Sequence, residues 1–426
     1  MSTPRLLLFC FGLVPGFLFA QNQNPGCDGF RYKQDQFQTV KKTTLPYATA
    51  ISHTGQSITL SMDVYEPDGD TCSQRPVIVM EHGGSFIFGN KSDMAKWCQL
   101  LARKGYVAAS IQYRLYPIFQ LGFPDSTDIM DTAMKAVGDM KAAVRFFRED
   151  ATTDNMFRAD TTHIFIGGYS AGAVAALHAA FLDDADVLPA FLQSILTANG
   201  GLNGNSGNAA NQSHSSAISA VINMSGGLYR RAWINSEEVP MSSIHGTADA
   251  TVPYESGLAA NLAYLEGSGV LHPQALSVGN WSYLETVPGG GHTDIYDQAQ
   301  FAAQLGNFWT QTTTLLEYLT CYADSLPVLV SIKQPGDMPS NPKWLIYPNP
   351  VIKGQQQVSI QLPEPVRGTI SAVVYSLEGK EVIRVKNTLS GTSGIPTAEL
   401  APGVYFVRLL DEKGRYVPGV RRLVVQ

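Results

Sequence analysis

The chain has 426 residues, of which 44% are hydrophobic and 15% are charged, a composition that describes a globular protein able to bury a core. This length leaves room for one large domain and one smaller one. The formal net charge of −6, without any run rich in Lys and Arg, gives no electrostatic reason to expect a nucleic-acid partner.

Residues 1–20 predict an export signal. Arg5 supplies a positive charge, Leu6–Phe19 form a short apolar run, and Ala20 is a small residue at a plausible cleavage point. A proline and a glycine interrupt the run, and no other segment approaches the ~20 apolar residues that a membrane-spanning helix needs. We therefore expect an exported protein without a membrane span.

Four cysteines remain after the signal, an even number in an exported chain: Cys27, Cys72, Cys98 and Cys321. They allow two disulfides in three pairings. Cys98 and Cys321 fall in helical patterns that the predicted fold packs on one face of its sheet, so we favour Cys27 with Cys72 and Cys98 with Cys321. The alternative is four reduced, buried thiols.

The first regular pattern, from Leu45 to Glu66, alternates apolar and polar residues and predicts an antiparallel hairpin. Continuous apolar runs then predict strands buried on both faces, with helical patterns between them. The strands are Pro76–Met80, Tyr106–Ile111 and His163–Ile166, and the helices are Met94–Lys104 and Asp131–Arg148. This alternation predicts an α/β fold with a mostly parallel sheet covered by helices on both faces.

Residues 198–216 are rich in Asn, Gly and Ser and predict a long surface loop near the site. The second half of the α/β domain then predicts three strands and two helices. These are strands at 217–222, 239–244 and 283–287, a helix at 254–266 and a long helix that reaches residue 320. We assign residues 21–324 to this domain.

Residues 325–343 have the composition of a linker. Residues 344–426 contain short β-type runs divided by turn signals, which predict a small all-β sandwich. No group of carboxylates, histidines or cysteines occurs in this segment, so we expect no chemistry there.

The sequence Gly168-Tyr-Ser-Ala-Gly172 stands between a predicted strand and an alanine-rich helical pattern. G-x-S-x-G in that context predicts a nucleophile elbow, in which glycines make room for a serine at a strained backbone position. Ser170 is therefore the candidate nucleophile. A glycine-rich loop without chemistry is the alternative interpretation.

A serine hydroxyl needs a base to become a nucleophile, and that base needs an orienting acid. Asp249 follows one predicted strand and His292 lies in a glycine-rich loop after the next. The order Ser, Asp, His is that of α/β-hydrolases. Taken singly, Asp249 could cap a helix after Pro253 and His292 could be an ordinary loop residue, and Asp294 is a rival acid.

The developing oxyanion requires backbone donors. Gly84 and Ser85 follow the strand that ends at Met80, where a donor loop belongs, and Ala171 follows the nucleophile. We expect their three N–H groups to form the oxyanion hole. We expect His82 to order this loop and His245 to be a strand-end residue.

The sequence has no histidines at metal-ligand spacing, no phosphate loop and no dinucleotide fingerprint near the strands, so we expect neither a metal nor a cofactor.

As a set, five motifs between residues 45 and 320 resemble α/β-hydrolase carboxylesterases of the hormone-sensitive-lipase and feruloyl/acetylxylan-esterase type. They are His82–Phe86, Tyr113–Leu115, Gly168–Gly172, His245–Asp249 and Gly291–His292. The resemblance implies an α/β-hydrolase fold and a serine carboxylesterase. Ser85 departs from it, because the family often has a third glycine there.

The tail resembles the C-terminal sorting domain of the type IX secretion system of Bacteroidetes. The resemblance rests on Tyr347–Pro350, Leu377–Lys380, Leu400–Tyr405 and Arg422–Gln426. It implies that the tail is recognised by the secretion machinery and that the protein is secreted or exposed at the cell surface after crossing the periplasm. A carbohydrate-binding module is the competing interpretation, which the scarcity of aromatic residues in the tail disfavours.

These features together predict an exported serine esterase that works through an acyl-enzyme on small, aryl or carbohydrate-linked esters. The alternatives are a lipase for longer acyl chains, a prolyl-oligopeptidase-like peptidase and a binding protein of hydrolase fold. Such peptidases usually carry a large gating domain before the hydrolase, and non-catalytic relatives usually lack a member of the triad.

Overall fold

The computed structural model describes most of the first 322 residues and the strands of the tail. The described residues are 24–236, 238–322, 345–347, 351, 353, 357–361, 369–376, 380–388, 394–410 and 416–425. The predicted signal peptide (1–20) and linker (325–343) lie outside them. The chain divides into two compact units, Met1–Ser325 and Leu326–Gln426.

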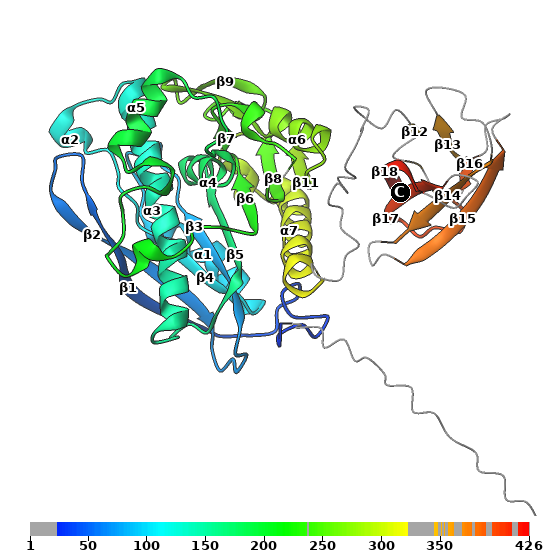
Figure 1. The fold of residues 1–426 in the computed structure, drawn as a ribbon, viewed down its shortest axis with the longest axis horizontal. Helices are drawn as coiled ribbons and strands as arrows, with labels where there is room; N and C mark the ends of the chain where they lie inside the picture. The colour runs from blue at the N-terminus through cyan, green and yellow to red at the C-terminus, as the bar shows by residue number, and fades with distance from the viewer. Residues whose placement is uncertain are drawn as a thin grey trace, which may run out of the picture. The chain divides into compact units, whose positions relative to one another are not determined.

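The first unit is built on an eight-stranded sheet with the order β1-β2-β4-β3-β5-β6-β8-β11 (Figure 1). β1 and β2 form an antiparallel hairpin, β2 pairs antiparallel with β4, and every later pair is parallel. The strands are β1 Val40–Ile51, β2 Ser57–Pro67, β3 Arg75–Glu81, β4 Val107–Ile111, β5 Ala159–Tyr169, β6 Ala220–Met224, β8 Met241–Gly246 and β11 Ser282–Val287.

Helices cover both faces of this sheet. They are α1 Ala95–Arg103, α2 Ile118–Leu121, α3 Ser126–Thr152, α4 Ala171–Phe181, α5 Ala190–Ala198, α6 Ser268–Ser277 and α7 Ala302–Tyr322. Short 3-10 helices lie at Lys91–Met94, Gly201–Asn203, Asn211–Ser213, Arg231–Trp233, Asp294–Tyr296 and Ala299–Phe301.

Alternate residues of the central strands enter two separate cores. Val77 and Val79 of β3 join a cluster with side chains of α3 and α4, whereas Ile78 and Met80 join a cluster with side chains of α1 and α7. Because successive side chains of a strand point to opposite faces, a strand buried on both faces reads as the continuous apolar run seen in the sequence. The predicted α/β architecture is confirmed.

The predicted helix at 254–266 is wrong. This segment forms a hairpin of β9 (Ser256–Ala259) and β10 (Ala263–Gly267), and β10 also pairs with β7 (Gly227–Leu228). Ala260 and Asn261 make the turn with positive φ angles of 48° and 59°. The alanines and leucines favour a helix locally, but pairing with β7 overrides that preference.

The predicted disulfide pairing is also wrong. Cys27 bonds to Cys321, while Cys98 is buried and reduced and Cys72 is half-buried and reduced. Cys98 and Cys321 do belong to one core, as expected, but the N-terminal segment runs beside α7 and brings Cys27 to its end. The ion pair between Lys33 and Glu317 joins the same two segments, with 3.1 Å between Nζ and Oε1.

Residues 198–216 follow a different course from the predicted loop near the site. Ser206 and Asn211 are fully buried, and Arg114 of the β4–α2 connection donates to Ser206 Oγ over 2.6 Å. Asn211 donates to the backbone oxygen of Tyr47 in β1. Hydrogen bonds to buried polar side chains therefore fix this segment against β1 and α3.

The described residues of the second unit form two antiparallel sheets. One has the order β12-β13-β16 and the other β15-β14-β17-β18, with Val358, Ile395 and Val407 in a shared core. The strands are β12 Leu345–Tyr347, β13 Gln357–Gln361, β14 Thr369–Tyr375, β15 Glu381–Thr388, β16 Gly394–Pro396, β17 Gly403–Leu410 and β18 Tyr416–Val425. The predicted β-sandwich is confirmed.

Among the described residues, no helix has the length and apolar character required to cross a membrane.

Candidate active site

Ser170 occupies the sharp turn between β5 and α4. Its φ and ψ angles of 54° and −119° lie outside the regions that most side chains adopt, which is the strain expected of a nucleophile elbow. A Cβ atom on Gly168 would lie 2.3 Å from the carbonyl carbon of Gly172, and one on Gly172 would lie 2.2 Å from the oxygen of Glu81. The two glycines of the motif are therefore required by close backbone packing.

The structure brings the three predicted residues of the triad together. Ser170 Oγ lies 2.7 Å from Nε2 of His292, and Nδ1 of His292 lies 2.7 Å from Oδ2 of Asp249. Both distances are those of hydrogen bonds. The three residues follow the carboxyl ends of β5, β11 and β8, which lie at one edge of the parallel sheet.

Asp249 is held by donors on both carboxylate oxygens. Oδ1 accepts from the backbone N–H groups of Thr251 and Val252, and Oδ2 accepts from His292. Burial by itself raises the pKa of this carboxyl, but hydrogen bonds from His245, His292 and the backbone outweigh it and hold the pKa well below its usual range. The group is thus a carboxylate that can orient and stabilise an imidazolium.

The loop that carries His292 is fixed by two side chains. The hydroxyl of Tyr169 donates to the backbone oxygen of His292 over 3.3 Å, and their rings lie 5.3 Å apart. Oδ1 of Asp294, the rival acid in the sequence, accepts from the N–H of Gly291 over 2.8 Å. Asp294 therefore braces the loop, and Asp249 is the acid that meets the imidazole.

The loop after β3 presents backbone donors beside Ser170. A Cβ atom on Gly83 would lie 3.1 Å from Cβ of Ser170, so this loop is in direct contact with the nucleophile. Nδ1 of His82 donates to the oxygen of Gly83 over 2.7 Å. Because N–H and C=O of one trans peptide point in opposite directions, the N–H of Gly84 points away from His82. Gly84 and Ser85 have positive φ angles of 118° and 55°.

His82 has the loop-ordering contacts that the sequence predicts. It is fully buried, its ring stacks on Tyr113 with 4.4 Å between centroids, and the Tyr113 hydroxyl donates to the backbone oxygen of His82 over 2.9 Å. Burial lowers the pKa of His82, so the ring is neutral at physiological pH.

A small apolar cavity of about 50 Å³ opens beside Ser170. Its walls come from the loop after β3, from α3, from α4 and from the hairpin of β9 and β10. The apolar residues that line it include Phe86, Met130, Val252, Ala259 and Leu265. Residues 198–216, predicted to form a loop near the site, do not line it, and neither do residues 116–125.

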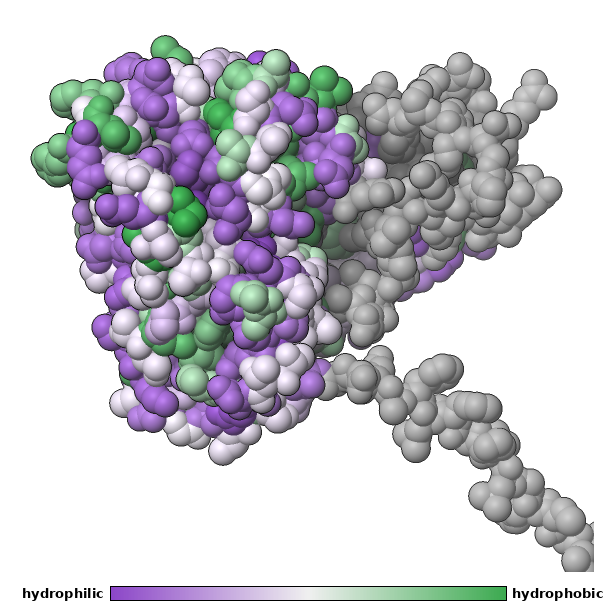
Figure 2. Space-filling view, turned by 60° about the vertical axis from the view of Figure 1, so that its left-hand side comes forward, coloured by the Kyte–Doolittle hydropathy of each residue, from purple (hydrophilic) through white to green (hydrophobic). Residues whose placement is uncertain are grey.

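The segment around α2 lies beside this cavity and exposes apolar side chains. Phe119 and Phe123 are 97% and 92% exposed. The N–H of Tyr116 donates to the oxygen of Phe86, and the hydroxyl of Ser126 donates to the oxygen of Leu262, so both ends of the segment contact cavity-lining residues. Figure 2 shows one face of this unit, where apolar groups are set apart by polar surface.

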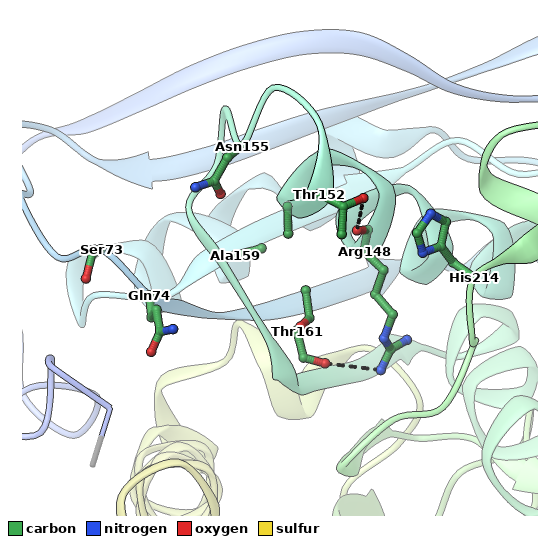
Figure 3. Close-up of a pocket in the computed structure, with 9 residues that line it drawn as sticks. Ser73, Gln74, Arg148, Thr152, Asn155, Ala159, Thr161 and His214 are labelled. Carbon is green, nitrogen blue, oxygen red and sulfur yellow. Dashed lines mark hydrogen bonds between the residues drawn. The ribbon is translucent and has the colours of Figure 1, made fainter. Parts of the chain in front are cut away.

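A second cavity, of about 350 Å³, lies at the opposite edge of the sheet (Figure 3). Gln74, Arg148, Asn155 and His214 are among its polar lining residues. The guanidinium of Arg148 already donates to the backbone oxygens of Thr161, Ser215 and Ala217. The triad does not contact this larger cavity, so we place the chemistry at the smaller one.

The described residues contain no group of three or more His, Cys, Asp and Glu side chains arranged to hold a metal ion.

The sequence analysis missed the contribution of the β9–β10 hairpin to the cavity, because it predicted a helix at residues 254–266. Gly257 is the signal that could have corrected it, since glycine disfavours a helix interior. Tyr169, inside the serine motif, was also missed as a support of His292.

Comparison with known proteins identifies two regions. Residues 62–228 match the sequence model of the BD-FAE family, and residues 345–426 match that of the secretion system C-terminal sorting domain. Esterase-5A of Drosophila persimilis is 29% identical over 117 residues, which are 27% of this chain and 20% of the relative. Esterase-5B of the same fly is 28% identical over 119 residues, again 20% of the relative. The chain thus matches about a fifth of the length of these curated esterases.

Among solved structures, esterase 2 of Thermogutta terrifontis, phosphorylated by paraoxon, aligns over 66% of this chain and 95% of its own. Its sequence is 20% identical and the TM-score is 0.46.

Proposed function

We propose that this chain, whose residues 62–228 match the BD-FAE family and whose residues 345–426 match a secretion system sorting domain, is an exported serine carboxylesterase. The observation that carries the proposal is the pair of hydrogen bonds that links Ser170 to His292 and His292 to Asp249. That arrangement suits the activation of a serine hydroxyl for acyl transfer.

In the proposed mechanism, Ser170 Oγ attacks the ester carbonyl carbon while its proton passes to Nε2 of His292. The N–H groups of Gly84, Ser85 and Ala171 donate to the oxyanion of the tetrahedral intermediate. The intermediate collapses to an acyl-serine as the alcohol leaves with the proton from His292. Water then attacks the acyl-serine, again losing its proton to His292, and the acid and free Ser170 are formed.

The substrate we propose is an ester with a short acyl group. The apolar cavity of about 50 Å³ beside Ser170 is far smaller than the ~150 Å³ cavity in which a benzene molecule fits. An acyl group of two to four carbons suits this space, whereas a long chain does not. The alcohol part would extend past the exposed Phe119 and Phe123, which suits an aryl group or a larger acceptor.

The second candidate function is a lipase, which the same exposed phenylalanines favour. The small cavity argues against it. For a prolyl-oligopeptidase-like peptidase we find no supporting contact in the described residues, such as a carboxylate in the cavity wall that could hold a peptide amino group.

We also propose that the sorting domain addresses the protein to the type IX secretion machinery, so that the esterase acts outside the cell or at its surface. The match of residues 345–426 supports this address.

The test is hydrolysis of p-nitrophenyl esters from acetate to palmitate by the purified chain, with Ser170→Ala as the matched variant. We expect kcat/KM to be highest for acetate to butyrate and to fall by at least ~100-fold at palmitate, with Ser170→Ala inactive throughout. A preference for palmitate would establish the lipase instead. Folded wild-type protein that hydrolyses none of these esters would refute the proposal.

A further inference from the structure

His245 lies at the end of β8, fully buried and next to the carboxylate of the triad. Its Nε2 atom is 3.0 Å from the backbone oxygen of Val252 and 3.3 Å from Oδ2 of Asp249. Its Nδ1 atom is 2.8 Å from Oγ of Ser268, the first residue of α6. No part of the proposed triad mechanism uses this imidazole.

The neighbours of His245 determine which nitrogen carries its proton. Both groups near Nε2, the Val252 oxygen and the Asp249 carboxylate, can only accept, so Nε2 carries the proton and donates. Nδ1 of a neutral ring then accepts the hydroxyl proton of Ser268.

The next side chain in the network fixes Ser268 in turn. Oδ1 of Asn223 accepts the N–H of Gly226, so its Nδ2 points to the opposite side and donates to Oγ of Ser268 over 3.0 Å. Nδ2 also donates to Ser243 over 3.1 Å. Asn223, Ser268 and His245 are each less than 1% exposed, so water does not compete for these hydrogen bonds. Along the path from Asn223 through Ser268 to His245, each donor therefore points toward Asp249.

The Asp249 carboxylate is the group that this path of hydrogen bonds reaches. Oδ1 accepts from Thr251 and Val252, and Oδ2 accepts from His292 at 2.7 Å. Nε2 of His245 lies 3.3 Å from the same Oδ2 atom, while its hydrogen bond goes to the Val252 oxygen. A carboxylate has about four lone-pair sites, so three are filled by hydrogen bonds and the N–H of His245 is the group nearest to the fourth. His245 thus lies next to Oδ2 of Asp249, the oxygen that also orients His292.

We propose that His245 is a positioning residue for the triad. On this view, which rests on the proposed function, the Nε2–H group of His245 fixes the rotation of the Asp249 carboxylate and shares the negative charge of Oδ2 with His292. The buried relay from Asn223 through Ser268 keeps His245 in the donating tautomer.

Because Oδ2 of Asp249 interacts with both His245 and His292, a change at one histidine alters the electrostatic environment of the other. When His245 stops donating, Oδ2 keeps more negative charge for His292, and the protonated base becomes more stable. The acid limb of the kcat/KM profile, which reports protonation of the base in the free enzyme, then moves to higher pH. Loss of the fixed rotation lowers kcat with little change in KM.

Other titratable groups surround this network and stay constant in the comparison of variants. They are Tyr254, whose ring meets that of His245 edge-on, Tyr169 and Tyr296 beside His292, Asp294, which accepts from Gly291, and Asp297 near Tyr169. Burial raises the pKa of Tyr169 and Tyr296 above the usual value, so both remain neutral through the acid limb.

The experiment compares His245→Phe with His245→Gln, using p-nitrophenyl acetate and the full chain. Phenylalanine fills the space without a donor, whereas the side-chain amide of glutamine places an N–H near the position of Nε2. We expect His245→Phe to lose about tenfold in kcat, as for loss of one hydrogen bond to a charged group, with KM within about twofold and the acid limb at higher pH. We expect His245→Gln to recover most of the wild-type kcat and to have its acid limb of kcat/KM at the wild-type pH.

His178→Phe is the matched control, because His178 is also a fully buried histidine. Its hydrogen bonds go to the backbone oxygen of Val174 and the backbone N–H of Tyr229, away from the triad. This variant should lower the melting temperature without moving the acid limb. The inference is overturned if folded His245→Phe has its acid limb of kcat/KM at the wild-type pH. It is also overturned if His245→Gln loses as much kcat as His245→Phe. Turnover that persists in Ser170→Ala would instead overturn the proposed function.

Discussion

Two buried carboxyl groups at the same edge of the sheet differ in the hydrogen-bond donors around them and in the direction of their pKa shifts. Glu81 ends β3 and is 0% exposed, and Asp249 follows β8 and is 8% exposed. Three groups donate hydrogen bonds to Asp249 and Nε2 of His245 lies 3.3 Å from it, whereas neither side-chain oxygen of Glu81 accepts a hydrogen bond from any described residue. Burial alone therefore does not determine the charge of a carboxyl group at this edge.

The pKa shifts of the two groups have opposite signs for this reason. Burial, with the nearby negative charge of Asp139, raises the pKa of Glu81 well above its usual value and so favours the uncharged form of its side chain. Burial acts on Asp249 in the same direction, but the donors around it lower its pKa. A charge is maintained only where the fold supplies donors, and it is maintained at the residue that the proposed chemistry requires.

The largest expected effect comes from Asp249→Asn, which keeps the shape of the side chain and removes its charge. The amide presents an N–H to one of its former donors and no longer stabilises the imidazolium of His292. We expect kcat to fall by about 10⁴-fold, the size of effect known for an acid-to-amide change in a serine triad. Steady-state kinetics on p-nitrophenyl acetate, with circular dichroism to verify folding, measures it. A loss of less than tenfold would contradict the role of Asp249.

An intermediate effect is expected from Glu81→Gln on the pH dependence of stability. The side chain ionises near pH 4.5 in the unfolded chain, and its pKa is higher in the folded chain. Between these two values the folded state holds a proton that the unfolded state has released, so stability falls as pH rises, by up to about 1.4 kcal/mol per pH unit. Glutamine cannot ionise, and the variant should lose this slope.

Urea denaturation at several pH values from about 5 to 8 compares the wild type with Glu81→Gln. We expect the difference in unfolding free energy to grow with pH in favour of the variant. Two parallel curves would show that Glu81 is ionised or paired in the folded protein, and the contrast with Asp249 would disappear.

The smallest effect is expected from Asp294→Asn, the same substitution at the rival acid. Asp294 contacts the N–H of Gly291 and does not orient the imidazole, so we expect kcat/KM within about threefold of wild type. The same assay as for Asp249→Asn measures it. A loss comparable to that of Asp249→Asn would mean that the sequence offers two working acids and that we chose wrongly between them.

The sequence was sufficient to predict the sheet and the meeting of the loops that carry Ser170, Asp249 and His292. Their signals are local: a buried strand is a continuous apolar run, and Ser170, Asp249 and His292 each follow such a run directly. Parallel strands bring their carboxyl ends to one edge, so the prediction that these loops meet required no side-chain geometry.

Features that depend on contacts between distant segments could not be predicted. The bond between Cys27 and Cys321 spans 294 residues, and it depends on how the N-terminal segment runs beside α7. The hairpin of β9 and β10 exists because β7 pairs with it, and β7 has only two residues, Gly227 and Leu228. The sequence shows His245 as a strand-end residue, but its distance from Asp249 follows from the turn at Gly246 and from Ser268 on α6.

The most direct test of the central claim is reaction of the full chain with a fluorophosphonate, which transfers its phosphonyl group to an activated serine and releases fluoride. We expect one phosphonyl group per chain, located on Ser170 by mass spectrometry of the peptides, with labelling slowed strongly in Asp249→Asn. A folded wild-type chain that takes no label, or takes it on a different residue, would contradict the account.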